Sequence, residues 1–402
     1  NSVVQMSFDL KFENVFKIST ASWHLIRCHP SVVRNTVWKI QVFTILVMFL
    51  ICFYFLIYSI FWHDIKDGRY TDATKNGAML IVSITVTFKY FMLIHQQESI
   101  RNLIKVVDDD YELAKDASDE EKDIVLHYAE RGVRVCKYWI VASCGTSSTF
   151  PVKAFVSMIW YYWQGQFEVV PMFELSYVKI VEQYKEVIPV FCVLFMIHFI
   201  FAAYAALMYV SFDPLVPILM LHTCGQLDIL SRKLSKLFVE TGDPREIEEE
   251  LKKIIKKLQL LIRSVIAFIV KNNYKLLFEF VLKTTTLLLP LSAFQVVQVC
   301  GLRYKYINVE FISFFLASGL HLFVPCYYSD ILMETSENFR QAIYSCGWEK
   351  CPDVRVRKTI LFMLTRARVP MGISTVFCIV NLDTFTSRQS YTIFNLMNAA
   401  WT

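Results

Sequence analysis

Apolar runs, each about twenty residues long, constrain what this chain can fold into more than any other feature. A run of that length matches the ~30 Å hydrocarbon core of a bilayer, because an α-helix rises about 1.5 Å per residue. Of the 402 residues, 55% are hydrophobic and 19% are charged, whereas a soluble domain has roughly 45–50% apolar and about 25% charged residues. We therefore predict an all-α membrane protein rather than a soluble globular one.

Seven of these runs are predicted to span the membrane. The first begins well inside the chain and has no small-residue cleavage site behind a short apolar core, so it does not read as a signal peptide. The last is more polar than the others. The predicted spans are Val42–Trp62, Gly77–Ile94, Tyr138–Tyr162, Val187–Val210, Leu276–Val299, Phe311–Tyr328 and Ser374–Ala400.

Lysine and arginine are distributed unevenly among the segments that join the spans. Cationic loops resist translocation across the membrane, whereas acidic residues have little influence. The amino-terminal segment and every second loop after it hold 29 lysines and arginines, and the intervening segments hold 7. We therefore expect a cytoplasmic amino terminus and an extracellular carboxyl terminus.

The segments outside the membrane carry no pattern that indicates catalysis, a cofactor or nucleic acid. The net charge of +5 is dispersed among acidic residues. Of eleven cysteines, only Cys300 falls in a segment predicted to be outside, so no extracellular disulfide is expected. Cys346 and Cys351 have a vaguely metal-like spacing, but no second pair accompanies them. Nucleophile-elbow, phosphate-loop and zinc-protease motifs are missing from the sequence. We expect no catalytic residue, no cofactor and no metal site.

The segment between the fourth and fifth spans contains a predicted amphipathic helix. Its apolar residues recur at steps of three and four, and acidic residues stand four positions before lysines on the other face. This stripe could lie on the membrane surface or pack against helices of neighbouring subunits; the lack of aromatic anchors favours packing. We expect helices 4–6 to extend into a cytoplasmic anchor domain. The predicted subunit anchor is Ile247, Leu251, Ile254 and Leu258.

The seventh span carries polar side chains at helical spacing. A polar seam along a membrane helix must face protein or water. It could form a polar interface between helices of one subunit, or it could line a water-filled pathway. The seam continues almost to the end of the sequence, which favours the pathway, although Arg388 is unfavourable for cations. The seam consists of Asn381, Thr384, Arg388, Tyr391, Asn395 and Asn398.

Ionisable residues within the other spans are expected to be structural. Lys89 lies near the predicted inner end of the second span, from which its amine could reach the headgroups. Lys153 follows Pro151, which should kink the third helix and leave a cavity wall in the outer half of the membrane. His198 and His321 are expected to form interhelical hydrogen bonds.

From Ser329 onward the chain resembles the carboxyl-terminal signature of insect odorant receptors. The individual motifs are degenerate, and their order and spacing carry the resemblance over about seventy residues. They are Glu334 with Ser336–Glu337, Ala342–Ile343–Tyr344, Trp348, Arg357–Lys358, Arg366–Ala367–Arg368 before Pro370, Thr384–Phe385 and, more loosely, Ser390–Tyr391–Thr392.

This resemblance implies a tuning subunit of a heterotetrameric, ligand-gated, non-selective cation channel, paired with the odorant-receptor co-receptor (Orco). It implies a multi-pass protein of the plasma membrane in the dendrite of an olfactory sensory neuron, with a small volatile ligand. The last helix would line the pore through Tyr391, Asn395, Leu396, Asn398, Ala399 and Ala400. Ligand would bind between the second, third, fourth and sixth helices, at Ser83, Thr87, Tyr90, Ser148, Pro151, Phe155, Phe201, Tyr204, Phe315 and Gly319.

The resulting division of the chain has six parts. They are a cytoplasmic segment 1–41, spans 1–4 with the ligand pocket (42–210), a cytoplasmic extension (211–275), spans 5–6 (276–328), a cytoplasmic anchor (329–373) and the pore-lining helix (374–402).

Four alternatives make different predictions. The co-receptor has an enlarged second cytoplasmic loop, for which this chain has no room. Gustatory receptors carry a Thr-Tyr then Gln-Phe pattern in the last helix, where this chain has Thr384–Phe385 and then Tyr391–Thr392. A G-protein-coupled receptor would have its amino terminus outside, and neither an Asp-Arg-Tyr after the third span nor an Asn-Pro-x-x-Tyr in the seventh is present. A transporter predicts internal repeats, and none is evident.

Overall fold

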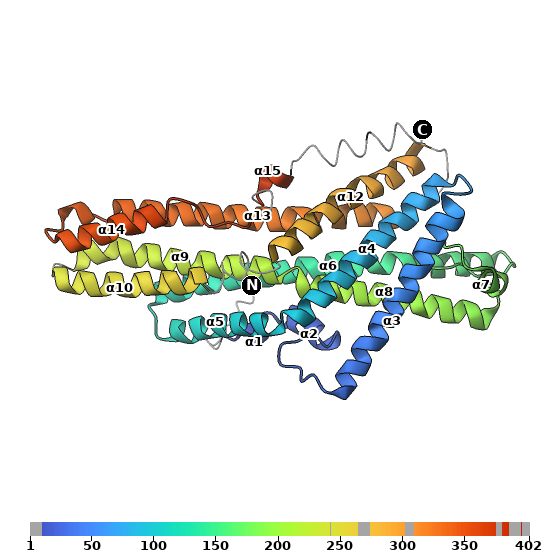
Figure 1. The fold of residues 1–402 in the computed structure, drawn as a ribbon, viewed down its shortest axis with the longest axis horizontal. Coiled ribbons are helices and arrows are strands. Elements are labelled where there is room, and N and C mark those ends of the chain that lie inside the picture. Colours follow the sequence, from blue (N-terminus) through green and yellow to red (C-terminus); the bar gives the residue numbers. More distant parts are fainter. Residues whose placement is uncertain are drawn as a thin grey trace.

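The computed structural model describes residues 10–241, 243–263, 274–301, 309–374, 380–385 and 395. In these ranges the chain forms an elongated bundle of long helices (Figure 1). The helices are α1 (Phe12–Val15), α2 (Lys17–Leu25), α3 (Thr36–Tyr58) continued by a π-helical turn η1 (Ser59–Asp64), α4 (Tyr70–His95), α5 (Gln97–Lys115), α6 (Asp119–Trp163), α7 (Lys179–Tyr184), α8 (Ile188–Phe212), α9 (Leu215–Glu240), α10 (Pro244–Leu261), α12 (Tyr274–Gly301), α13 (Val309–Ser345), the 3-10 turn η3 (Trp348–Lys350), α14 (Val354–Arg366) and α15 (Leu382–Phe385).

Five helical stretches of the described chain are long and apolar enough to cross a membrane. They coincide, within two residues at the ends of the fourth and fifth, with the predicted first, second, fourth, fifth and sixth spans or include them. The third predicted span forms the second half of α6, which is helical throughout but interrupted by serine, threonine and lysine side chains. The seventh predicted span lies largely outside the described residues. The five apolar stretches are Thr36–Asp64, Tyr70–His95, Ile188–Glu240, Phe278–Val297 and Glu310–Lys350.

Helix α3 shows how composition suits these helices to lipid. Asn35 caps its start, because its side-chain oxygen accepts a hydrogen bond from the backbone N–H of Trp38 at 2.8 Å. The helix is apolar on every side, and only 17% of its most hydrophobic window is buried within the protein. Large side chains such as Phe43 and Leu50 are exposed. A helix that is apolar all round and mostly uncovered is stable only if lipid covers it.

Helix α6 is the longest element and links the two ends of the molecule. It begins at Asp119, well before the predicted start of the third span, and continues unbroken through Pro151. Ser118 caps its first turn, where three acidic residues face the positive end of the helix dipole. We expected extensions only for helices 4–6, and the third helix is extended as well.

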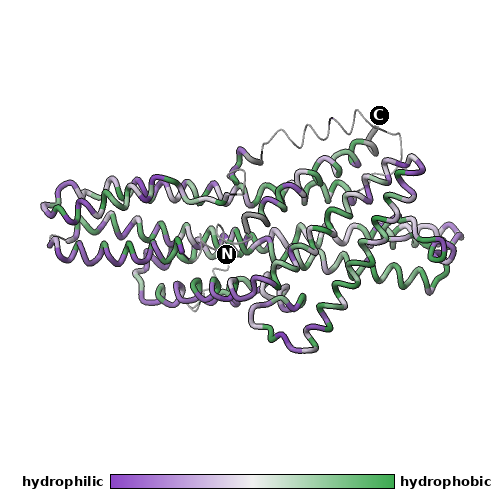
Figure 2. Tube along the Cα trace, viewed as in Figure 1, coloured by the Kyte–Doolittle hydropathy of each residue, from purple (hydrophilic) through white to green (hydrophobic). Residues whose placement is uncertain are grey.

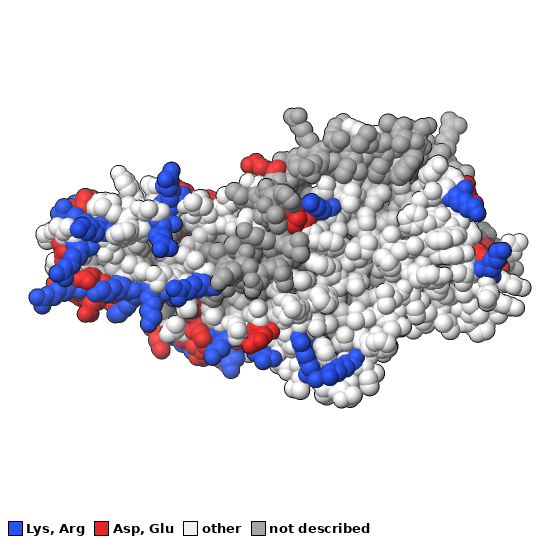
Figure 3. Space-filling view, viewed as in Figure 1, with Lys and Arg blue, Asp and Glu red and all other residues white. Residues whose placement is uncertain are grey.

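In Figure 3, most of the charged side chains gather at one end of the bundle, on the left of the view. The middle of the visible face carries few charged side chains. At this charged end, α9, α10, α14 and the last part of α13 pack side by side (Figure 1). Hydrophilic positions alternate with hydrophobic ones along these helices (Figure 2), as amphipathic helices require. Gly347, whose φ of 90° is in the left-handed region, ends α13 and turns the chain toward η3 and α14.

The predicted anchor stripe on α10 is buried within this chain. Its four residues are at most 9% exposed and face α9 and α14. Most of the stripe is thus covered without a second subunit. Apolar side chains that remain exposed on these helices include Tyr344, Val354, Leu361 and Phe362.

Three buried or partly buried hydrogen bonds attach the amino-terminal helices to the bundle. Trp23 Nε1 donates to the carbonyl oxygen of Ser211 at 2.8 Å, and Ser19 Oγ donates to that of Val210 at 2.8 Å. The backbone N–H of Phe12 donates to Asp108 Oδ1 at 2.7 Å. These contacts hold α1 and α2 against α5 and α8, before the chain enters its first membrane helix.

Candidate ligand-binding cavity

A cavity of about 90 Å³ lies inside the bundle between α4, α6, α8, α12 and α13. A water needs about 10–15 Å³ by the same measure, so the space holds roughly six to nine water-sized groups. That is the size of a small organic molecule. Its lining residues are Met79, Val82, Trp139, Ala142, Ser143, Thr146, Ser147, Phe150, Phe173, Phe201, Ala202, Ala205, Ala206, Tyr209, Leu288, Phe314, Ala317, Ser318 and His321.

Most polar atoms of the wall are already occupied. The hydroxyl of Ser147 donates to the carbonyl oxygen of Ala202 at 3.2 Å, and that of Ser318 donates to Phe314 at 2.8 Å. Trp139 differs. Its side chain is buried, and its Nε1 is one of the buried polar atoms without a hydrogen-bond partner in the described part of the chain. A buried donor without a partner is costly and rare, so an acceptor from a ligand would be favourable here.

A buried charged cluster lies beside the cavity and shares His321 with it. Lys89 Nζ donates to Asp213 Oδ1 at 2.6 Å and lies 2.9 Å from His321 Nε2. His321 Nδ1 lies 2.9 Å from Thr285 Oγ1, whose hydroxyl donates to Val281 O at 2.7 Å. If Nε2 accepts from the lysine, Nδ1 carries the proton and donates to Thr285. The cluster thus joins α4, α8, α12 and α13.

The expectation that Lys89 reaches the headgroups is wrong. Its side chain is 0% exposed, and its ammonium lies 4.1 Å from the centre of the Tyr209 ring as well as against Asp213. Burial of a charge is tolerated when a partner neutralises it. The sequence placed Asp213 in the loop after the fourth span, which concealed the pairing. The expected interhelical hydrogen bonding of His321 is confirmed.

The segment after α6 folds back over one side of the cavity. Phe173 lines the cavity and packs on Phe150, with ring centroids 5.3 Å apart. Next to it, Glu174 pairs with Lys75 on α4 at 2.7 Å, while Lys153 on α6 pairs with Glu310 on α13 at 2.5 Å. A smaller cavity of about 30 Å³ lies among these charged groups and shares Met79, Phe150 and Phe173 with the larger one. These three side chains therefore separate the two spaces.

Of the ten residues predicted to contact ligand, Phe201 lines this cavity. Several others stand one position from a lining residue: Ser83 follows Val82, Ser148 follows Ser147, and Pro151 follows Phe150. One position turns a helical side chain by about 100°, which moves it to another face. Of the remainder, Tyr90 and Tyr204 pack together with ring centroids 5.9 Å apart, outside the cavity wall. Their contact with ligand stays a prediction, as it does for Thr87, Phe155, Phe315 and Gly319.

Lining residues that the sequence reasoning missed include Trp139 and the small side chains of α8. Ala202, Ala205 and Ala206 are spaced by three and one, so they share one face of the helix. Small residues on one face of a membrane helix leave room between helices. That pattern could have located the cavity on the fourth helix.

The predicted pore residues lie almost entirely outside the described part of the chain. Tyr391, Leu396, Asn398, Ala399 and Ala400 lie outside the described residues, and Asn395 is exposed. The described chain before them is attached to α13. The backbone N–H groups of Met371, Ile373 and Leu382 donate to Ser336 Oγ, Ser329 Oγ and Asp330 Oδ2, each at 3.1 Å.

Comparison with known proteins gives consistent results for sequence and fold. Residues 69–391 match the family model described as "7tm Odorant receptor". Among curated proteins, the chain is 25% identical to Odorant receptor 13a of Drosophila melanogaster over 229 residues, which are 50% of this chain and 53% of the relative. It is 34% identical to Odorant receptor 2a of the same species over 90 residues, 21% of this chain and 22% of the relative. These matches span about half of the relatives' length or less.

Solved structures show the same fold over nearly the whole chain. The olfactory receptor OR5 of Machilis hrabei in complex with eugenol superimposes with a TM-score of 0.77 and 17% identity, covering 96% of this chain and 97% of that one. A second structure of the same receptor gives a TM-score of 0.74 at 15% identity, covering 96% of each chain.

The helical bundle and its long apolar helices are those of a multi-pass membrane protein. The family match covers well over half of the sequence, and the chain belongs to the seven-transmembrane odorant receptor family.

Proposed function

We propose that this chain is the odorant-binding subunit of a ligand-gated, non-selective cation channel, and that ligand binds in the cavity between α4, α6, α8, α12 and α13. The observation that carries the proposal is the cavity itself, because it is enclosed mainly by apolar side chains within a fold shared with odorant receptors. Sites for small ligands are typically such concave apolar spaces with few polar groups.

The wall favours a small, largely apolar molecule. Aromatic side chains from three helices supply dispersion contacts, and the hydroxyls of Ser147 and Ser318 are engaged with backbone carbonyls. The unpartnered Nε1 of Trp139 favours a ligand with one hydrogen-bond acceptor, such as a carbonyl, ether or hydroxyl oxygen. The shape and length of the molecule and the position of its oxygen atom then decide which ligand binds.

Helix α13 is suited to carry the effect of ligand to the pore. It lines the cavity through Phe314, Ser318 and His321, and it continues to the charged end. The chain that leads into the last segment is hydrogen-bonded to the middle of this helix. We propose that ligand shifts α13 and that the predicted pore residues, Tyr391, Asn395, Leu396, Asn398, Ala399 and Ala400, respond through this attachment.

We further propose that the charged end lies in the cytoplasm and carries the contacts with other subunits, including Orco, in a heterotetramer at the dendritic membrane of olfactory neurons. The excess of lysine and arginine in alternate loops supports this orientation. Because the α10 stripe is largely covered, the exposed apolar side chains Tyr344, Val354 and Phe362 are better placed than Ile247 or Leu251 to contact a neighbour.

The channel proposal is tested by recording currents in cells that express this chain with and without Orco, against a panel of small volatiles. We expect inward current with at least one ligand only when both chains are present. Replacing sodium and calcium with an impermeant cation should abolish it. Responses that persist after this replacement, or that require a G protein, would instead support the alternative of a G-protein-coupled receptor; responses restricted to non-volatile tastants would favour a gustatory-receptor-like channel.

A further inference from the structure

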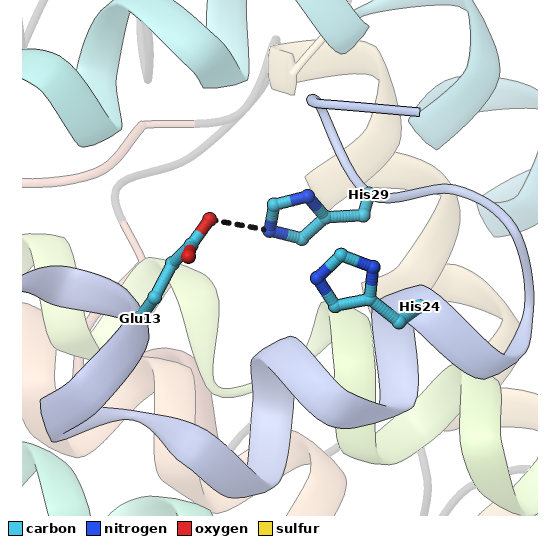
Figure 4. Close-up of side chains that lie close together, drawn as sticks. All are labelled: Glu13, His24 and His29. Atoms are coloured by element: carbon cyan, nitrogen blue, oxygen red, sulfur yellow. Dashed lines mark ion pairs between the residues drawn. The ribbon is translucent and has the colours of Figure 1, made fainter. Parts of the chain in front are cut away.

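Three potential metal ligands meet where the amino-terminal helices turn toward the first membrane helix (Figure 4). Glu13 lies on α1, His24 in the last turn of α2, and His29 in the turn before α3. One ligand atom from each lies within 4.8 Å of the other two. Within the described ranges, no other group of three histidine, cysteine or acidic side chains comes so close together.

His29 is already held in a suitable position. Its side chain is 3% exposed, its Nε2 faces Glu13 Oε1 at 3.3 Å, and its Nδ1 lies 2.7 Å from Ser31 Oγ. A metal-binding histidine commonly donates its second ring N–H to an oxygen, which fixes the tautomer and the ring orientation. Ser31 offers such an oxygen, but its backbone N–H donates to the same Nδ1 at 3.2 Å. Metal binding at Nε2 therefore requires the tautomer in which Nδ1 carries the proton and donates to Ser31 Oγ. Nε2 has no hydrogen bond of normal geometry, although it is buried, so a ligand at this nitrogen would satisfy it.

We propose that Glu13, His24 and His29 form a binding site for a divalent transition metal ion of the zinc class. Two imidazoles and one carboxylate are a common zinc ligand set that leaves a fourth position for water. The site is new relative to the ligand cavity and shares no residue with it.

Binding requires a small local rearrangement. Zinc bonds of about 2.0–2.1 Å place tetrahedral donors about 3.4 Å apart, closer than the 4.8 Å limit within which these atoms lie. The rings of His24 and His29 are stacked, with centroids 3.9 Å apart and 17° between their planes, so His24 must turn out of the stack. Both His24 and Glu13 are exposed, so each side chain can change its rotamer.

An ion at this position would tie three segments together. Helix α1 is held to α5 by the bond from Phe12 to Asp108, and α2 is held to α8 through Trp23. The His29 turn leads directly into α3. Metal binding would therefore stiffen the amino-terminal segment against the first membrane helix.

The test uses the purified full chain in detergent, stripped with a chelator and titrated with Co²⁺. We expect visible bands of tetrahedral cobalt without the near-ultraviolet charge-transfer band of thiolate ligation. We also expect Zn²⁺ to raise the midpoint of thermal unfolding. The exposed residues give safe variants: His24→Ala and Glu13→Gln should each weaken Co²⁺ binding at least tenfold and reduce the thermal shift. His127→Ala, which removes an exposed histidine of α6, is the matched control and should bind as the wild type does.

Either of two results would overturn the proposal. One is an unchanged cobalt spectrum and affinity in His24→Ala, or no spectrum at all in the wild type, which would leave a histidine–glutamate ion pair only. The other is a spectrum with thiolate bands, which would assign the ion to cysteines elsewhere in the chain.

Discussion

The indole N–H of Trp139 is expected to bind an oxygen atom of the ligand, and a substitution of this residue tests that contact. Trp139→Phe keeps an aromatic ring but removes the N–H that lacks a partner. A lost hydrogen bond is worth about 1 kcal/mol, so the effective concentration of an oxygenated agonist should rise roughly five- to tenfold. A hydrocarbon of the same length and shape should be unaffected. Equal losses for both ligands would show that the ring contributes packing alone.

The buried pair of Lys89 and Asp213 predicts a strongly non-additive pair of substitutions. Lys89→Met leaves the Asp213 carboxylate buried without its main partner and should cost about 3–5 kcal/mol. Asp213→Asn likewise leaves the Lys89 ammonium buried without its carboxylate partner. Lys89→Met with Asp213→Asn removes both charges and should recover much of the loss, as measured by the midpoint of thermal unfolding in detergent. Losses that simply add in the double variant would mean that the pair does not stabilise the bundle.

The sequence predicted which helices line the cavity better than it predicted which residues of those helices face it. The helices expected to hold ligand do line the cavity, and Phe201 is on its wall. Ser148 and Pro151 stand next to lining residues, because hydropathy locates a span without fixing the rotation of each helix about its axis. The prediction that Lys89 reaches the headgroups was wrong for a related reason. A charge in a span can face lipid headgroups or a partner, and only the fold places Asp213 beside it.

Among the elements, α5, α9 and α10 are joined at the charged end through one carboxylate. Asp110 Oδ2 lies 3.0 Å from His222 Nε2, and Lys257 donates to Oδ1. Burial alone would raise the pKa of Asp110, but the hydrogen bonds and positive charges of His222 and Lys257 hold it below its ordinary value. A lowered carboxyl pKa stabilises the fold at neutral pH, and that contribution is lost as pH falls below about 4.

Asp110→Asn should therefore lower stability at pH 7 by about 3 kcal/mol, since it leaves Lys257 and His222 without the carboxylate. The difference from the wild type should shrink as pH is lowered through the range in which Asp110 itself becomes protonated. Asp109→Asn alters the exposed neighbouring carboxylate and is the matched control, with little expected effect. Unfolding midpoints measured between pH 7 and pH 3 give both comparisons. A constant difference at every pH would rule out this role of the charge.

Most elements could be predicted from the sequence, because twenty-residue apolar runs and amphipathic stripes are local patterns. The α10 helix and its buried face were expected, and the structure places that face against α9 and α14. The full length of α6 was not predicted, because its amino-terminal half is too polar to be recognised as part of a membrane span. Nothing local in α10 indicates whether its stripe packs within the chain or between chains.

For the molecule as a whole, the fold is that of the seven-transmembrane odorant receptors, and the orientation proposed from loop charge can be checked separately. An epitope tag at the amino terminus should be labelled only after cells are permeabilised, whereas a tag at the carboxyl terminus should be labelled on intact cells. Surface labelling of the amino terminus would reverse the proposed topology.

Filling the cavity of the assembled channel tests whether ligand acts there. Ala205 lines the cavity on α8, and Ala203, two residues earlier on the same helix, is exposed on its outer surface. Odorant-evoked current should be recorded from cells that express each phenylalanine variant with Orco, at matched surface levels. We predict that Ala205→Phe abolishes the response or raises the effective ligand concentration more than tenfold, while Ala203→Phe responds as the wild type does. An unchanged response in Ala205→Phe would mean that ligand binds elsewhere.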